Sequence, residues 1–99
     1  MRYLWDESRR QTNLIKHGLD FADAAKVFAG PMALFEDGRK DYGEQRMIGI
    51  GLLETLVVLI VHVEADDSIR IYQLGRPGQT TIWRLGTARY ESHRGTLET

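Results

Sequence analysis

The chain has 99 residues, of which 42% are hydrophobic and 27% are charged, and it contains no cysteine. This length suits a single domain over residues 1–99, and the lack of cysteine excludes a disulfide framework and thiolate metal sites. The N-terminus lacks the apolar core of a signal peptide, and the longest apolar run, at 56–63, is too short to cross a bilayer. We therefore expect a cytoplasmic protein without membrane contact.

The formal net charge of −1 conceals an uneven distribution along the chain. Residues 1–69 carry eight Lys/Arg and twelve Asp/Glu, whereas residues 70–94 carry five arginines and one glutamate. Guanidinium groups bind phosphates in a bidentate manner. The basic segment is therefore compatible with an anionic partner, although an ordinary solvated surface is the more common reason for such a segment.

The first half of the chain predicts a short strand and two helices. Residues 1–4 are a strand candidate, and Asp6 is a candidate N-cap for a helix that ends at His17, with Gly18 as the left-handed residue after it. Asp20 is a candidate N-cap for a second helix, which the Gly-Pro pair at 30–31 ends. Apolar residues with helical spacing mark the buried side of this second helix: Phe21, Ala24, Ala25 and Phe28.

After the second helix the hydrophobic period changes to two. Strand candidates separated by polar turns cover residues 32–35, 46–52, 56–63 and 69–74. The run at 56–63 is apolar on both faces, which is typical of a central strand. Thr80 or Thr81 is a candidate cap for a final helix through about Ser92. The predicted fold class is α+β, with two N-terminal helices, an antiparallel β-meander of three to four strands and a C-terminal helix.

Charged side chains near the ends of these elements are the candidate functional residues. Lys16 and His17 fall in the last turn of the first helix, where a cation is favourable for the helix dipole even without another role. Glu44 and Arg46 share a face if their strand begins by residue 44, and they could form a simple salt bridge. Arg70 lies between two isoleucines, so its guanidinium must reach water or an anion.

His62 ends the apolar strand and has three possible interpretations. It is either a core histidine or a group that titrates near neutral pH within a site. A metal site is the third, because Glu64 falls on the same side of the strand and Asp66 and Asp67 follow in the turn. That signal is weak, since H-x-E is short and the Ala-Asp-Asp-Ser sequence is common turn chemistry.

The order of these pieces resembles a known family. The shared pattern is W-D at 5–6, N-x-x-K-H-G at 13–18, F-x-x-A-x-x-V-F at 21–28 with Pro31, E-x-R-x-x-x-I-G at 44–51, His62 and I-R-I at 69–71. It resembles BrnT-type toxins of type II toxin–antitoxin systems, which have a RelE-like ribonuclease fold. The similarity covers about residues 1–71. Members usually continue with a segment ending in Arg-(Arg/Lys)-Ala, whereas this chain has Arg76 one position later, before Pro-Gly.

The resemblance implies an endoribonuclease that needs no metal or other cofactor and cleaves RNA by attack of the 2′-OH. Such chemistry needs a proton-transfer group and several fixed cations. The candidates for catalysis are Lys16, Glu44, Arg46, His62 and Arg70, and those for substrate binding are His17, Arg76 and Arg84. The resemblance also implies RNA as the substrate and a cognate, DNA-binding, BrnA-like antitoxin through which alone the toxin would reach DNA.

The alternative is a non-catalytic interaction module. It would keep the same fold but lack activity because of its altered C-terminal segment. The position of Arg76 discriminates between the two hypotheses, since the module is favoured if Arg76 does not reach a surface shared by Arg46 and Arg70.

Overall fold

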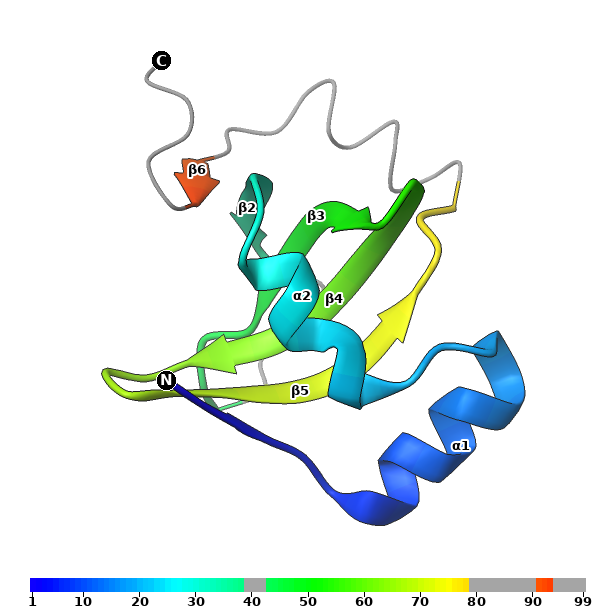
Figure 1. The fold of residues 1–99 in the computed structure, drawn as a ribbon. Coiled ribbons are helices and arrows are strands. Elements are labelled where there is room, and N and C mark those ends of the chain that lie inside the picture. Colours follow the sequence, from blue (N-terminus) through cyan, green and yellow to red (C-terminus); the bar gives the residue numbers. More distant parts are fainter. Residues whose placement is uncertain (39–42, 79–90, 94–99) are drawn as a thin grey trace.

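The computed structural model describes residues 1–38, 43–78 and 91–93. Figure 1 shows a twisted sheet with α2 across one face and α1 beside β5 at its margin. The elements in chain order are β1 (Arg2–Leu4), α1 (Glu7–His17), the 3₁₀ turn η1 (Phe21–Asp23), α2 (Ala24–Phe28), β2 (Met32–Glu36), β3 (Met47–Leu53), β4 (Leu56–Glu64), β5 (Ser68–Gly75) and β6 (Glu91–His93). The chain is therefore an α+β protein.

The sheet has six strands in the order β1-β5-β4-β3-β2-β6. Strands β2 to β5 form the predicted antiparallel meander, and β4, the run that is apolar on both faces, has a neighbour on each side. The outer strands extend the sheet beyond this meander. β1 lies parallel to β5, with Tyr3 opposite Ile69, and β6 lies antiparallel to β2, with Ser92 opposite Ala33.

The predicted C-terminal helix is wrong where the structure describes that part of the chain. Glu91–His93 form strand β6 rather than the end of a helix, because the edge of β2 offers them backbone hydrogen-bond partners that local sequence signals do not reveal. The rest of the predicted helix, with its candidate caps Thr80 and Thr81 and the candidate residue Arg84, lies outside the described residues.

The ends of α1 follow the capping signals in the sequence. The carboxylate of Asp6 accepts hydrogen bonds from the backbone N–H of Ser8 at 2.9 Å and from its hydroxyl at 2.8 Å. Gly18 takes a left-handed conformation, with φ of 71°, and its N–H donates to the carbonyl of Leu14 at 2.8 Å. A glycine tolerates this conformation without a Cβ clash, so the helix ends at the predicted residue.

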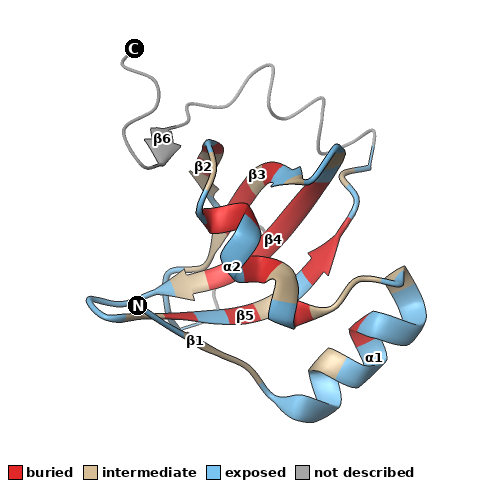
Figure 2. Cartoon of the chain, in the orientation of Figure 1, coloured by how far each residue is buried: buried red, intermediate tan, exposed pale blue. Residues whose placement is uncertain are grey.

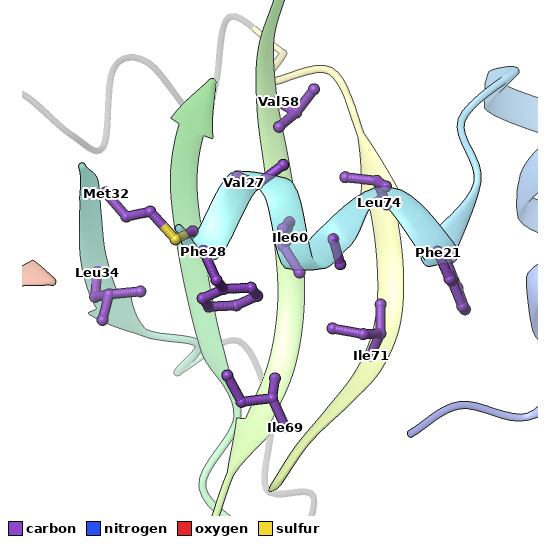
Figure 3. Close-up of a cluster of buried hydrophobic side chains, with 11 residues drawn as sticks. Phe21, Val27, Phe28, Met32, Leu34, Val58, Ile60, Ile69, Ile71 and Leu74 are labelled. Carbon is purple, nitrogen blue, oxygen red and sulfur yellow. The ribbon is translucent and has the colours of Figure 1, made fainter. Parts of the chain in front are cut away.

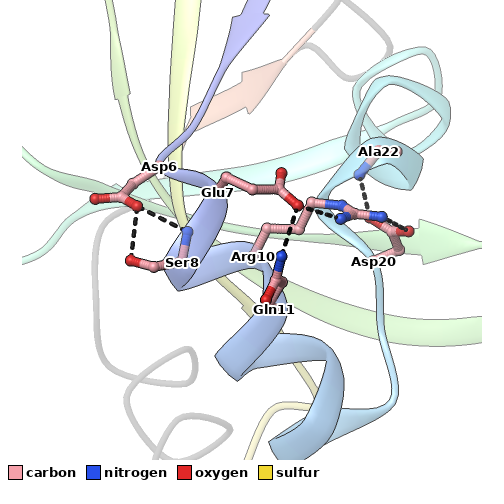
Figure 4. A network of polar contacts seen from close by, with 7 residues as sticks. All are labelled: Asp6, Glu7, Ser8, Arg10, Gln11, Asp20 and Ala22. Carbon is pink, nitrogen blue, oxygen red and sulfur yellow. Dashed lines mark hydrogen bonds and ion pairs between the residues drawn. The ribbon is translucent and has the colours of Figure 1, made fainter.

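The second helix begins as the tight turn η1 before it becomes α2. Asp20 caps this turn, since its carboxylate accepts from the N–H of Ala22 at 2.9 Å. The same carboxylate accepts from Arg10 Nε at 2.8 Å and Nη2 at 3.0 Å, which joins α1 to η1 (Figure 4). The Asp20 cap was predicted, whereas its bond to Arg10 was not.

The main hydrophobic core lies between α2 and the sheet, and α1 contributes little to it (Figure 2). Figure 3 shows its side chains, which are Phe21, Ala24, Val27, Phe28, Met32, Leu34, Val58, Ile60, Ile69, Ile71 and Leu74. Two glycines of β3 allow close packing here. A Cβ on Gly49 would lie 2.5 Å from Met32 Cε, and one on Gly51 would lie 2.8 Å from Val27 Cγ1.

The opposite face of the sheet, called the distal face below, carries a second apolar cluster. Ile48, Leu59 and Val61 are buried there, and Phe35, Ile50 and Tyr72 pack against them. Within the described ranges, no helix is both long and apolar enough to cross a membrane.

Candidate functional site

Tyr72 of β5 joins several predicted site residues on the distal face. Its hydroxyl donates a hydrogen bond to Glu44 Oε2 at 2.9 Å, and the guanidinium carbon of Arg46 lies 4.1 Å from its ring centroid, a close cation–π distance. Arg46 Nε also lies 3.6 Å from Glu44 Oε2. Glu44, Arg46 and Tyr72 thus form one connected group. Glu44 and Arg46 lie just before β3, which begins at Met47 and not by residue 44 as their predicted shared strand face required, and Tyr72 lies in β5.

Arg70 lies on the same face as this group. Ile69 and Ile71 point into the core, so strand alternation directs Arg70 to the distal face. Arg70 pairs with Val63 of β4. On the other side of β4, Met47 pairs with His62. Arg46, the residue before Met47, therefore lies level with Val63. The backbones of Arg46 and Arg70 are therefore about two strand spacings, or about 10 Å, apart. The structure thus places the guanidinium groups of Arg46, just before β3, and of Arg70, in β5, on one face.

The surroundings of Tyr72 favour its neutral, hydrogen-donating form. Burial raises the pKa of the hydroxyl, and the hydrogen bond to the negative Glu44 raises it further, while the charges of Arg46 and Arg70 act in the opposite direction. The hydroxyl therefore keeps its proton at neutral pH and is available as a donor.

A cleft of about 260 Å³ lies between α1 and β5, directly beside this group. Ser8, Arg9, Thr12 and Lys16 of α1 line it together with Tyr72 and Gln73 of β5. His17 and the buried Asn13 complete the wall on the α1 side. Tyr72 belongs to both the cleft and the Glu44–Arg46 group, so the two form one continuous surface.

The charge of this surface is positive. Arg9 lies over the ring of Tyr72, with its guanidinium carbon 5.4 Å from the centroid. Across the part of the chain that the structure describes, Arg9, Lys16 and Arg70 take part in no ion pair. Together with Arg46 these cations outnumber the carboxylate of Glu44, so the surface suits an anionic ligand.

Asn13 holds α1 against β5 and so determines the width of the cleft. Its side-chain amide donates to the carbonyl of Leu74 at 2.8 Å and to that of Leu19 at 3.0 Å. Its side-chain oxygen accepts from the N–H of Leu74 at 3.2 Å. These bonds occupy an edge of β5 beyond the end of β1, where a further strand would otherwise pair.

His62 lies on the other face of the sheet, away from these residues. Its side chain is fully buried, and its ring meets Phe28 edge-on at 4.9 Å between centroids. Nε2 lies 2.9 Å from Glu64 Oε2, and Nδ1 lies 3.2 Å from the carbonyl of Ile60. The structure therefore gives His62 the environment of a core histidine and does not bring it to the cationic surface.

The third interpretation of His62 was a metal site that also includes Glu64, Asp66 and Asp67. Asp66 and Asp67 lie in the exposed turn between β4 and β5. In the described parts of the chain, no group of three or more His, Asp or Glu side chains is arranged to hold a metal ion.

Arg76 is exposed and follows the last residue of β5. It is not one of the residues that line the cleft. It lies six positions of mostly extended chain from Arg70, which corresponds to about 20 Å. The structure therefore does not add Arg76 to the Arg46–Arg70 surface.

Several residues of this surface were not candidates from the sequence. Tyr72 could have been recognised, because strand alternation placed it on the side of Arg70. Two missed residues of α1 also carried a signal: Ser8 and Thr12 are spaced by four from each other and from the candidate Lys16, so the three form one row of the helix. Gln73 carried no signal, because its exposure to the cleft depends on the position of α1.

Comparisons with known proteins show the family to which the chain belongs. The family model described as "Ribonuclease toxin, BrnT, of type II toxin-antitoxin system" matches residues 5–73. Among solved structures, the chain is similar to the Brucella abortus ribonuclease toxin BrnT, determined at 1.1 Å resolution. That match has a TM-score of 0.61 and 27% sequence identity, and it covers 80% of this chain and 99% of the Brucella chain. No curated protein matches the chain.

Proposed function

The chain belongs to the BrnT family of ribonuclease toxins of type II toxin–antitoxin systems, and from this premise we propose that it cleaves RNA in the cytoplasm without a metal ion. The observation that carries the proposal is the connected group of Glu44, Tyr72 and Arg46 beside Arg70 on one face of the sheet. It combines a proton acceptor with cations that can hold a phosphodiester, as metal-independent cleavage requires.

In the proposed reaction, Arg46 and Arg70 bind the oxygens of the scissile phosphate. Glu44 accepts the proton of the 2′-OH as the 2′-oxygen attacks phosphorus, and the bond from phosphorus to the 5′-oxygen breaks. The leaving oxygen takes a proton from Lys16, which lines the cleft together with Tyr72; His17 lies against Gly75, about 16 Å along β5 from Arg70. The products are a 2′,3′-cyclic phosphate and a 5′-hydroxyl.

Tyr72 has a positioning role in this proposal. Its hydrogen bond holds the carboxylate of Glu44 at 2.9 Å, while its ring supports the guanidinium of Arg46. The substrate is single-stranded RNA, because an unpaired nucleotide can rotate its 2′-OH into line with the scissile bond. His62 is left out of the reaction because it is buried on the opposite face.

Membership of a type II system implies an antitoxin partner. We further propose that this partner is a BrnA-like, DNA-binding protein, and that the toxin reaches DNA only through it. The positive surface described above is suited to acidic groups of such a partner as well as to RNA.

The decisive experiment incubates the purified protein with single-stranded RNA, with and without EDTA. We expect cleavage that resists EDTA and leaves cyclic phosphate ends, which mass spectrometry detects. Arg46→Ala and Arg70→Ala should each lower the rate by about 100-fold or more, since each removes a cation that stabilises the transition state. Lys26→Ala is the matched control, because Lys26 lies on α2 at the other face of the sheet.

A second candidate function is the non-catalytic module, which the position of Arg76 outside the Arg46–Arg70 surface favours. It predicts that expression of the chain alone does not arrest growth and that RNA stays intact. Cleavage that EDTA abolishes would contradict both hypotheses and return attention to a metal-dependent reaction.

A further inference from the structure

The side of α1 that faces β5 is unusual for a helix beside a sheet, because it is polar along its whole length. Ser8, Thr12 and Lys16 form one row of that side, and Arg9 and His17 lie in the neighbouring row. A helix normally turns its apolar side toward the protein. Here the apolar side chains lie elsewhere, since Ile15 is 88% exposed and Leu14 is 38% exposed.

This polar side is not required to attach the helix. Asn13 binds the backbone of β5, and Arg10 binds Asp20, so these residues hold α1 without Ser8, Arg9, Thr12 or Lys16. The latter four instead surround the open cleft. Polar groups that face an open cleft and are not needed to hold the fold together are typical of a binding site.

The chemistry of the cleft fits one nucleotide. Arg9 and Lys16 supply positive charge for a phosphate, while the hydroxyl of Thr12 and the amide of Gln73 can donate to and accept from the edge of a base. The volume of about 260 Å³ exceeds what a phosphate alone needs and falls just below the range of about 300–1,000 Å³ for drug-sized ligands.

We propose that this cleft is a nucleotide subsite that binds the nucleoside on the 3′ side of the scissile phosphate and reads its base. The inference rests on the proposed function, because Tyr72 links the cleft to the group that would hold the scissile phosphate. Arg9 binds the 3′-phosphate of this nucleoside, and Gln73 with Thr12 contacts its base. Sequence-specific recognition of RNA depends on such contacts to unstacked bases.

Direct binding tests this subsite without relying on cleavage. Isothermal titration calorimetry compares the nucleoside 3′-monophosphates of the four RNA bases with inorganic phosphate. We expect at least one nucleotide to bind tighter than phosphate by about tenfold or more, since base contacts add to the phosphate contacts. Gln73→Ala and Thr12→Ala should each weaken binding of the preferred nucleotide about fivefold and leave phosphate binding unchanged.

Gln11→Ala is the matched control, because Gln11 is an exposed amide on the same helix that does not line the cleft. Thermal melting of each variant shows whether a loss of binding reflects unfolding. In active protein, Gln73→Ala should also reduce the preference for the base that follows the cleavage site.

The outcomes separate this inference from the proposed function. RNA cleavage without nucleotide binding, or with equal binding of phosphate and all nucleotides, would overturn the subsite and leave the ribonuclease intact. Nucleotide binding that depends on Gln73 in a protein without cleavage activity would support the subsite and reject the reaction. Equal weakening by Gln73→Ala and Gln11→Ala would also refute the subsite.

Discussion

Replacing Asn13 by alanine tests how α1 is held against the sheet. The side chain of Asn13 is the partner of three backbone groups: the N–H and the carbonyl of Leu74 and the carbonyl of Leu19. Alanine can replace none of these bonds. The substitution would therefore leave polar backbone groups without partners at a buried position, since Asn13 itself is only 6% exposed.

The expected cost follows from these bonds. A buried polar group that loses its partner costs roughly 1–3 kcal/mol. The cleft beside Asn13 lets water replace part of the lost hydrogen bonding. We therefore take about 1 kcal/mol for each of the three backbone groups and expect a total loss of about 3 kcal/mol in the free energy of unfolding. This is a large share of the roughly 5–15 kcal/mol that stabilises a typical domain.

Urea unfolding, followed by tryptophan fluorescence, measures this change, with Gln11→Ala as a control expected to stay within about 0.5 kcal/mol of the wild type. Asn13→Asp adds a second readout. At neutral pH its carboxylate would face the carbonyls of Leu19 and Leu74, which raises the carboxyl pKa in the folded state. Stability should therefore increase as the pH falls through that pKa. An Asn13→Ala protein as stable as the Gln11→Ala control would refute the reasoning.

Three further predictions concern packing, pH and salt. Gly51→Ala should destabilise the fold by about 1–3 kcal/mol, because its Cβ would meet Val27 at 2.8 Å; urea unfolding checks this, and Gly78→Ala, which meets nothing within 4 Å, should change little. Hydrogen bonds from Arg10 and from a backbone N–H hold the pKa of Asp20 below its usual 3.8, so this carboxylate stabilises the fold above that pH and its contribution is lost as the pH falls through the folded-state pKa. Acidification should therefore destabilise the wild type more than Asp20→Asn, and equal losses of unfolding free energy would contradict this. RNA affinity should fall linearly on a plot of log affinity against log salt concentration, since binding releases counterions from phosphates; filter binding that is independent of salt would exclude the cationic surface as the RNA site.

Individual residues show where inference from the sequence succeeded. Asp6, Gly18 and Asp20 end or begin helices as predicted, since a cap involves only a few neighbouring residues. Alternation along residues 69–72 also agrees with the position of Arg70 and Tyr72 on the same face. Alternation did not show whether His62 is a core residue or a site residue. It groups residues by face of the sheet, but it does not show which face a helix covers.

The sequence by itself therefore determined the helix caps, the antiparallel meander of β2 to β5, and the family to which the chain belongs. These features rest on local spacing and on motifs that can be read along the chain. Only the tertiary structure decided that Glu44 contacts Tyr72, 28 positions away, and that Asn13 binds the backbone of Leu74, 61 positions away. It also decided that residues 91–93 pair with β2. The physical reason is that such contacts depend on strand order and register, which the packing of the whole chain selects and no short segment encodes.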